Sequence, residues 1–262
     1  MTNRVPILMY HQVSPQPVAA FAKYTVTPQA FAAQMTWLRL AGYTPITLDA
    51  LLAYRRSDHR QPRRPIVITF DDGFQGCVEY AVPILQAKGF TAAFYLVAGL
   101  MGKTSAWLAA ERGVTFPLMD WATARRLLAA GFQCGAHTLS HPRLANLDAA
   151  TCHDELWTAR RVLADQLGLE VRHLAYPFGS FNERVRTLAA ETGYHSACSV
   201  EIGFSTPEDD PLALRRIPVN GQDSLLDFIC RLRTAYPFAE SWRSKTASLR
   251  RQLRTVGGYS TR

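Results

Sequence analysis

Cysteine is scarce in this sequence and is not arranged for a disulfide framework. The 262 residues contain five cysteines, an odd number, and no two of them form a Cys-x-x-Cys pair. This spacing argues against both a disulfide-stapled domain and a cysteine-ligated zinc site. We therefore expect reduced cysteines that pack as small apolar residues. They are Cys77, Cys134, Cys152, Cys198 and Cys230.

Long apolar stretches are also missing. No run of 18 apolar residues exists, which excludes a membrane-spanning helix, and the apolar stretch after Met1 is too short for a secretory signal. From this pattern we expect a cytoplasmic protein. Charged residues make up only 19% of the chain and hydrophobic residues 48%, which is typical of a globular fold rather than a disordered one.

What is present is a repeated alternation of apolar strand-like runs and amphipathic helices, most helices being followed by glycine. This alternation predicts a parallel sheet or barrel, and an α/β barrel commonly occupies about 250 residues as one domain. We expect an α/β fold, a distorted (β/α)7-type barrel formed by residues 1–235. Strands are predicted over 5–10, 66–70, 91–97, 132–136, 173–176 and 194–200, and helices over 28–40, 78–88, 121–130, 148–167, 182–191 and 224–234.

Residues 236–262 differ from the rest and are predicted to form a basic C-terminal tail. From Trp242 onward the tail carries six basic and no acidic residues. One interpretation is a solvated, frayed end; the other is peripheral contact with an anionic membrane surface or a lipid-linked glycan. The whole chain has a net charge of +8, but its basic residues are spread out and lack interleaved aromatics, so nucleic acid is not expected as a partner.

Two adjacent carboxylates and two histidines follow predicted strands. Asp71 and Asp72 come directly after the apolar run 66–70, and His137 and His141 follow the strand over 132–136. The carboxyl ends of parallel strands form the active face of α/β barrels. An Asp-Asp-Gly turn alone is common, and so is a lone His-x-x-x-His. Together they supply the two imidazoles and one carboxylate that a hydrolytic zinc site requires.

These segments resemble the polysaccharide deacetylases of the NodB-homology type, carbohydrate esterase family 4. The resemblance spans about residues 5–219 and rests on residues 69–73, 137–141 and 176–179 (Thr-Phe-Asp-Asp-Gly, His-Thr-Leu-Ser-His and Tyr-Pro-Phe-Gly). Residues 9–13 and 214–219 look like the branch that includes poly-N-acetylglucosamine deacetylases. The resemblance implies a distorted barrel of about seven strands and a divalent metal, most commonly Zn²⁺, with Co²⁺ or Ni²⁺ as alternatives.

The resemblance also implies roles for individual residues. Asp72, His137 and His141 match the metal ligands, and Asp71 matches the general base that assists metal-bound water in attacking an acetyl carbonyl. A backbone N–H near Phe178 would stabilise the oxyanion. Tyr176 and Phe178, in the turn that also contains Pro177 and Gly179, are candidates to line the sugar site. Trp121 is a further candidate for the groove, although helix capping by Asp120 together with core packing is the favoured explanation of this segment.

The sequence departs from the family pattern at two positions. The family's base-orienting arginine is replaced by Ala175, so Arg215 or Arg216 is predicted to supply that cation from a later strand end. The late histidine that protonates the leaving amine is also missing, since His195 is the last histidine in the chain. His11 is predicted to take its role, with return of the proton by Asp71 as the alternative.

The pattern thus predicts a metal-dependent hydrolase that removes N-acetyl groups from the sugars of a polysaccharide or glycan precursor. An O-acetyl esterase or small-amide amidase could use the same residues. A non-catalytic glycan-binding domain is the alternative from a different class, favoured by the two departures and disfavoured by the intact Asp71, Asp72, His137 and His141.

Overall fold

Seven parallel strands form a closed barrel in the computed structural model, which describes residues 4–56, 62–238 and 240. The order around the barrel is β1-β10-β9-β8-β7-β6-β5, and pairing of β1 with β5 closes it. This arrangement confirms the predicted (β/α)7 barrel. The strands are β1 (Ile7–Tyr10), β5 (Pro65–Phe70), β6 (Ala93–Leu96), β7 (Gln133–Ala136), β8 (His173–Ala175), β9 (Ser196–Ile202) and β10 (Leu214–Pro218).

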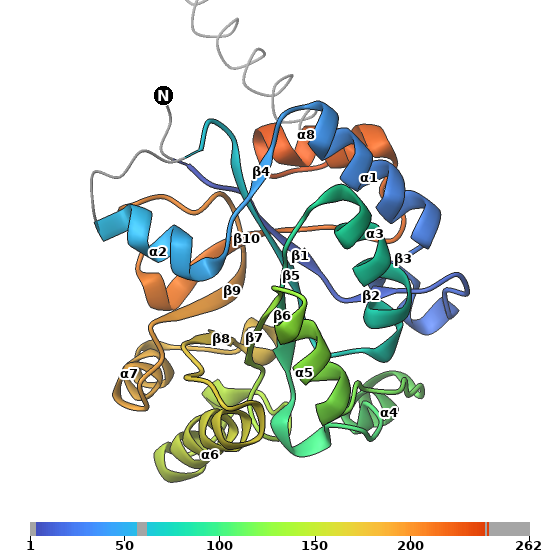
Figure 1. Ribbon diagram of the computed structural model, residues 1–262. Coiled ribbons are helices and arrows are strands. Elements are labelled where there is room, and N and C mark those ends of the chain that lie inside the picture. The colour runs from blue at the N-terminus through green and yellow to red at the C-terminus, as the bar shows by residue number, and fades with distance from the viewer. Residues whose placement is uncertain (1–3, 57–61, 239, 241–262) are drawn as a thin grey trace, which may run out of the picture.

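Helices surround the strands, and α1 and α8, from opposite ends of the described chain, lie side by side (Figure 1). The helices are α1 (Pro28–Leu40), α2 (Leu48–Arg56), α3 (Val82–Lys88), α4 (Ala106–Arg112), α5 (Trp121–Ala129), α6 (Ala149–Leu167), α7 (Glu183–Glu191) and α8 (Leu225–Thr234). No helix among the residues described here has the length and apolar character needed to cross a bilayer.

Helix starts follow the capping chemistry of the sequence. Thr27 accepts a hydrogen bond from the Ala30 amide at the start of α1, and Asp120 accepts one from the Thr123 amide at the start of α5. These side chains satisfy backbone N–H groups that have no partner within the helix. The predicted helix over 78–88 is a π-helical turn, η2 (Cys77–Ala81), followed by α3.

Several short elements were not predicted. They include α2, α4, the strand β4 (Thr44–Pro45) beside β5, the small sheet of β2 (Gln12–Val13) and β3 (Thr25–Val26), and the 3₁₀ turn η1 (Ala19–Tyr24). Helix α4 is only seven residues long, and Ser105 before it makes no side-chain capping bond. Such elements leave a weak local pattern because packing, rather than propensity, stabilises them.

The barrel interior is filled by alternate strand residues. Ile7, Val67 and Tyr95 belong to one buried cluster, while their strand neighbours belong to a second cluster that packs under the helices. The Tyr95 hydroxyl lies 3.2 Å from Cys198 Sγ, although β6 and β9 are not adjacent strands. That contact therefore crosses the inside of the barrel, and the interior is a packed core rather than a pore.

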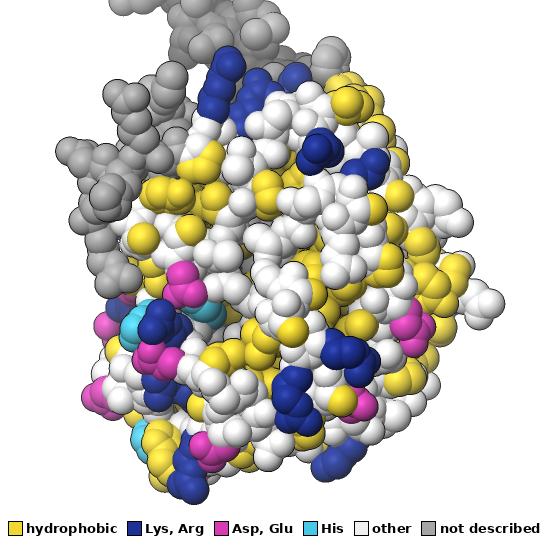
Figure 2. Space-filling model, in the orientation of Figure 1, with side chains coloured by type: hydrophobic (Ala, Val, Ile, Leu, Met, Phe, Trp, Pro, Cys, Tyr) yellow, Lys and Arg dark blue, Asp and Glu magenta, His cyan; other side chains and the backbone are white. Residues whose placement is uncertain are grey.

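The predicted tail over 236–262 lies, apart from residues 236–238 and 240, outside the described residues. On the face of the molecule shown in Figure 2, basic side chains lie in several separate places with acidic side chains among them, so this face carries no single large patch of one charge.

Candidate active site

The three predicted metal ligands meet at the carboxyl ends of the barrel strands. Asp72 follows β5 and His137 follows β7, and both line one cavity of about 510 Å³ together with His141. Asp72, Thr138, His141 and Phe178 all have positive φ angles, between 56° and 74°. Among the described non-glycine residues only Ala235 shares this conformation. Since such conformations cost about 1–3 kcal/mol each, the fold holds strain at this mouth of the barrel.

Asp72, His137 and His141 form one compact cluster. Asp72 Oδ1 lies 3.3 Å from His137 Nε2 and 3.1 Å from His141 Nε2, and the three ligand-type atoms all lie within 4.8 Å of one another. All three side chains are buried. Within the described chain, no other group of three histidine, cysteine, aspartate or glutamate residues meets this spacing.

The hydrogen bonding of His137 indicates that the cluster is built for a cation. Its Nδ1 lies 2.8 Å from the carbonyl oxygen of Ala175, which can only accept, so Nδ1 carries the proton. In the neutral ring Nε2 is then a bare acceptor, and it faces the Asp72 carboxylate, another acceptor. Burial lowers the pKa of His137, but Asp72, Asp71 and the Ala175 carbonyl together raise it above its ordinary value, so the surroundings of this ring favour positive charge. A divalent metal satisfies the same donor set.

His141 supports the same interpretation. Its Nε2 faces Asp72, while its Nδ1 is buried and has no hydrogen-bond partner within the part of the chain that the structure describes. Burial lowers the pKa of His141, which favours the neutral imidazole that a metal ligand must be. The ring of Trp107 stacks on this imidazole, with 4.2 Å between centroids and 19° between planes.

Glu155 of α6 holds the loop between the two histidines. Its Oε2 accepts hydrogen bonds of 2.9 Å from the backbone N–H groups of Leu139 and Ser140, and its Oε1 accepts one of 2.5 Å from the Ser140 hydroxyl. The Thr138 hydroxyl accepts a further bond from the His141 amide at 3.0 Å. These bonds stabilise a loop that contains two positive-φ residues.

Asp71 is paired with Arg216, and Arg215 does not contact it. Arg216 donates from Nη1 and Nη2 to the two carboxylate oxygens at 2.6 and 2.7 Å, and from Nε to the Ser199 carbonyl at 2.8 Å. Arg215 is half-exposed, and its ion-pair neighbours are Glu201 at 3.6 Å and Asp209 at 3.9 Å. Burial alone would raise the pKa of Asp71, but Arg216, with smaller contributions from His137 and His11, lowers it below its usual range.

His11 follows β1 and lines the cavity beside Asp71 and Asp72. Its ring lies 5.0 Å from that of Tyr24. Burial lowers the pKa of His11, and the two aspartates offset this only in part. The imidazole is therefore neutral at pH 7, which favours the alternative in which Asp71 returns the proton.

The 176–179 turn supports the cavity wall. Phe178 packs edge-on against the His141 ring at 4.6 Å, while Tyr176 is buried, stacks on Phe181 and donates to the Leu212 carbonyl. Tyr176 nevertheless lines the cavity, so it contributes to the cavity wall while its ring and hydroxyl are held from behind. Gly179 has a φ of 64°, and a Cβ atom there would lie 2.2 Å from Val200 Cγ2, so only glycine fits.

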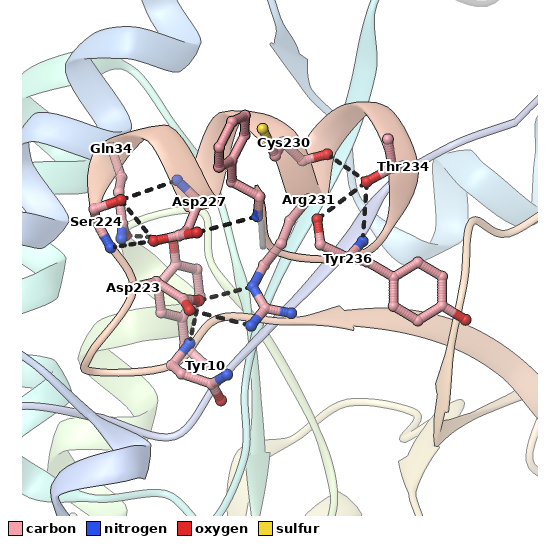
Figure 3. A network of polar contacts seen from close by, with 11 residues as sticks. Tyr10, Gln34, Asp223, Ser224, Asp227, Cys230, Arg231, Thr234 and Tyr236 are labelled. Atoms are coloured by element: carbon pink, nitrogen blue, oxygen red, sulfur yellow. Dashed lines mark hydrogen bonds and ion pairs between the residues drawn. The ribbon is translucent and has the colours of Figure 1, made fainter. Parts of the chain in front are cut away.

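Sequence reasoning missed several residues that line the cavity. Trp121 lies outside the lining residues and packs against the core, whereas Trp107 of the unpredicted α4 lines the cavity. Arg231 of α8 also reaches it; Figure 3 shows this side chain held by Asp223, with distances of 2.8 and 3.1 Å. Further basic lining residues are Lys23, Arg112 and Arg143. Their spacing in the sequence carries no recognisable signal.

The family model described as "Polysaccharide deacetylase" matches residues 58–197, more than half of the chain. The chain belongs to the polysaccharide deacetylase family. Members of this family are carbohydrate deacetylases, and Asp71, Asp72, His137 and His141 all fall inside the matched segment.

Relatives in this family cover most of the chain. YxkH of Bacillus subtilis is 24% identical over 83% of this chain and 72% of its own length. A poly-β-1,6-N-acetyl-D-glucosamine N-deacetylase of Staphylococcus aureus is 22% identical over 75% of this chain and 68% of its own length. The deacetylase PplD of Streptococcus pyogenes has the same fold, with a TM-score of 0.77, 21% identity and coverage of 90% of this chain and 100% of that one.

Proposed function

We propose that this protein is a metal-dependent N-deacetylase that hydrolyses the N-acetyl groups of a polysaccharide or glycan precursor. The observation that carries the proposal is that two hydrogen-bond acceptors, His137 Nε2 and Asp72 Oδ1, face each other. A cation bound between them would satisfy both atoms. Asp72, His137 and His141 would hold a divalent ion, Zn²⁺ in the first place. Such an ion supplies a Lewis acid that polarises the acetyl carbonyl and makes water more acidic.

Asp71 is proposed as the general base. Arg216 keeps its carboxylate ionised and fixes the plane of both oxygens, so that one can accept the proton of the attacking water. Asp71 then returns that proton to the leaving amine, with His11 as the second candidate for this step. A backbone N–H near Phe178 is proposed to stabilise the oxyanion.

Aromatic and apolar side chains suit a sugar substrate. Tyr24, Trp107 and Phe178 line the cavity together with Val200 and Ile202. Flat rings pack well on the apolar faces of pyranoses, and this lining supports a carbohydrate rather than a small amide as the substrate.

The experiment is acetate release by purified protein, paired with metal analysis. We expect acetate from N-acetylglucosamine oligomers in excess of that from O-acetylated xylan, loss of activity with a chelator, and recovery with Zn²⁺, Co²⁺ or Ni²⁺. Full activity of the metal-stripped protein would contradict the metal role. Faster release from the xylan would favour the esterase. Binding of the oligomers without any acetate release would favour the non-catalytic glycan-binding domain.

A further inference from the structure

One wall of the cavity carries two cations on a tyrosine ring. The Lys23 ammonium lies 5.6 Å from the centroid of the Tyr24 ring, and the Arg112 guanidinium lies 5.0 Å from it. Lys23 and Tyr24 end the turn η1, and Arg112 ends α4, so two distant segments each place a positive charge beside the same tyrosine ring. The same tyrosine ring packs against His11, which places this wall next to the proposed catalytic residues.

These two cations differ from the other basic residues of the cavity. Arg143 forms an ion pair of 3.0 Å with Glu111, and Arg231 forms one of 2.8 Å with Asp223. Lys23 and Arg112 have no carboxylate within ion-pair distance among the described residues. The hydrogen bonds of Arg112 go to the Ala20 carbonyl and the Tyr24 hydroxyl, and at 3.3 and 3.4 Å they are long.

A guanidinium with weak neutral partners can exchange them for an anion. Arginine binds phosphate and carboxylate through paired N–H donors, and a lysine beside it adds a second positive charge. The adjacent acid, Glu111, is already engaged by Arg143 and does not compete. Glu240 also lines the cavity, but it is exposed and lies beyond ion-pair distance of both cations. The other two acidic lining residues, Asp71 and Asp72, face Arg216 and the two histidines instead.

We propose that Lys23, Arg112 and Tyr24 form a subsite for an anionic group, phosphate or carboxylate, carried by the N-acetylated glycan. The substrate class would then be an acidic glycan rather than a neutral polymer. This inference rests on the proposed deacetylase function, because it places the anion on the same chain as the acetylated sugar.

The test compares three matched oligomers: neutral N-acetylglucosamine, the same oligomer with a phosphate monoester, and the same oligomer with a uronic acid. We expect kcat/KM for an anionic oligomer to exceed that for the neutral one by about tenfold at about 0.05 M NaCl, and the preference to shrink at about 0.5 M. The two anionic arms distinguish phosphate from carboxylate recognition.

Two double variants separate the subsite from the overall charge. Lys23→Gln with Arg112→Gln should abolish the preference for the anionic oligomers. Arg125→Gln with Arg161→Gln lowers the net charge equally on exposed surfaces of α5 and α6, and should leave the preference intact. Equal loss in both double variants would overturn the subsite, as would equal kcat/KM values for all three oligomers in the native protein.

Binding measurements keep this inference separate from the proposed function. The Kd of each oligomer is measured by calorimetry at both salt concentrations, without reliance on turnover. If no oligomer releases acetate, the deacetylase proposal fails, while tighter binding of the anionic oligomers still supports the subsite. Identical Kd values for neutral and anionic oligomers would overturn it.

Discussion

Each end of the barrel places a histidine imidazole 3.3 Å from an aspartate carboxylate. At the carboxyl ends of the strands the pair is His137 with Asp72, and at the opposite end it is His173 with Asp49. In both pairs Nε2 of the ring faces Oδ1 of the carboxylate. Judged by this distance alone, the two ends are equivalent.

The partner of the other ring nitrogen distinguishes them. His173 Nδ1 lies 2.9 Å from the Ser196 hydroxyl, which can donate, so His173 can carry its proton on Nε2 toward Asp49. In this tautomer a donor faces the Asp49 carboxylate, so the pair does not place two acceptors against each other, although at 3.3 Å the ring forms no hydrogen bond with it. His137 Nδ1 faces a carbonyl instead, and its Nε2 is left without a proton in front of a carboxylate.

Burial and strain also differ between the two ends. The Asp49 side chain is 47% exposed and is shared with Gln133 and Arg172, whereas that of Asp72 is 6% exposed and has a positive φ. Ser196, His173 and Asp49 have the composition of a hydrolase triad, yet the serine is fully buried and no substrate can reach it. The residue types are therefore similar at the two ends. What indicates the end that does chemistry is access for a substrate, together with two acceptor atoms that face each other without a proton between them.

The difference between the two ends is tested most strongly by removing one carboxylate from each end. Asp72→Asn should lower acetate release by more than about 1000-fold, since single electrostatic catalytic groups contribute about 100- to 1000-fold and a metal ligand is lost as well. Bound zinc, measured by elemental analysis, should fall with it. Asp49→Asn should leave both quantities unchanged. Equal losses in the two variants would show that the ends do not differ as we infer.

Arg216→Met should have the largest effect on stability. Breaking a buried ion pair leaves Asp71 uncompensated and costs about 3–5 kcal/mol, measured by urea unfolding at pH 7. In the native protein the pKa of Asp71 is lowered, so the pair stabilises the fold above the unfolded-state pKa of about 3.9, and this contribution is lost as the pH falls through the lower folded pKa.

In the variant, burial would instead raise the pKa of Asp71. Its stability deficit should therefore shrink as the pH falls, and the acidic limb of kcat/KM should move to higher pH. Arg215→Met is the matched control, with an expected change within about 0.5 kcal/mol, because Arg215 is half-exposed and its ion-pair distances are long. A deficit for Arg216→Met that does not vary with pH would contradict the coupling to Asp71.

The contrast between the ends also explains what the sequence could and could not predict. Asp72, His137 and His141 lie on short segments directly after clearly apolar strands. The local sequence pattern was therefore enough to predict that they lie at the same end of the barrel. The choice between Arg215 and Arg216 depends on which face of β10 points inward, and the register of that strand shifts between Leu214 and Arg216. A shift of one residue exchanges the two faces of a strand, which no local pattern reveals.

The cavity wall was beyond prediction for a different reason. Trp107 and Arg112 lie on α4, and Lys23 on η1, which are short elements stabilised by contacts with distant residues. For Trp121 the sequence left two interpretations, and the structure agrees with the one that combined capping by Asp120 with core packing. Elements follow from local chemistry, whereas cavity walls follow from how those elements pack.

Glu155→Gln tests whether the loop between His137 and His141 depends on the hydrogen bonds that it makes to Glu155. We expect the zinc affinity to fall by about tenfold, because partners that hold metal ligands in place contribute about 10- to 100-fold. Competition with a chromophoric chelator measures this directly. Asp154→Asn, the exposed neighbour on α6, should have no effect. If the zinc affinity of Glu155→Ala is unchanged, Glu155 has no part in holding the metal ligands in place.

His11→Ala tests the route of the proton. Because burial lowers the pKa of His11, and a bound cation would lower it further, we expect Asp71 to carry the proton and the basic limb of kcat to persist. Turnover should fall by less than about tenfold. A general acid contributes about 100- to 10,000-fold, so a loss of that size together with loss of the basic limb would identify His11 as the acid.

Ser196→Ala should have the smallest effect and tests the His173–Asp49 pair at the opposite end of the barrel. Removing the hydroxyl leaves His173 Nδ1 without its donor, and one lost hydrogen bond costs about 1 kcal/mol of unfolding free energy. Zinc content and acetate release should be unchanged. If zinc content falls as well, the two ends are coupled through the barrel core, and the hydrogen bonds of His137 alone do not define the metal site.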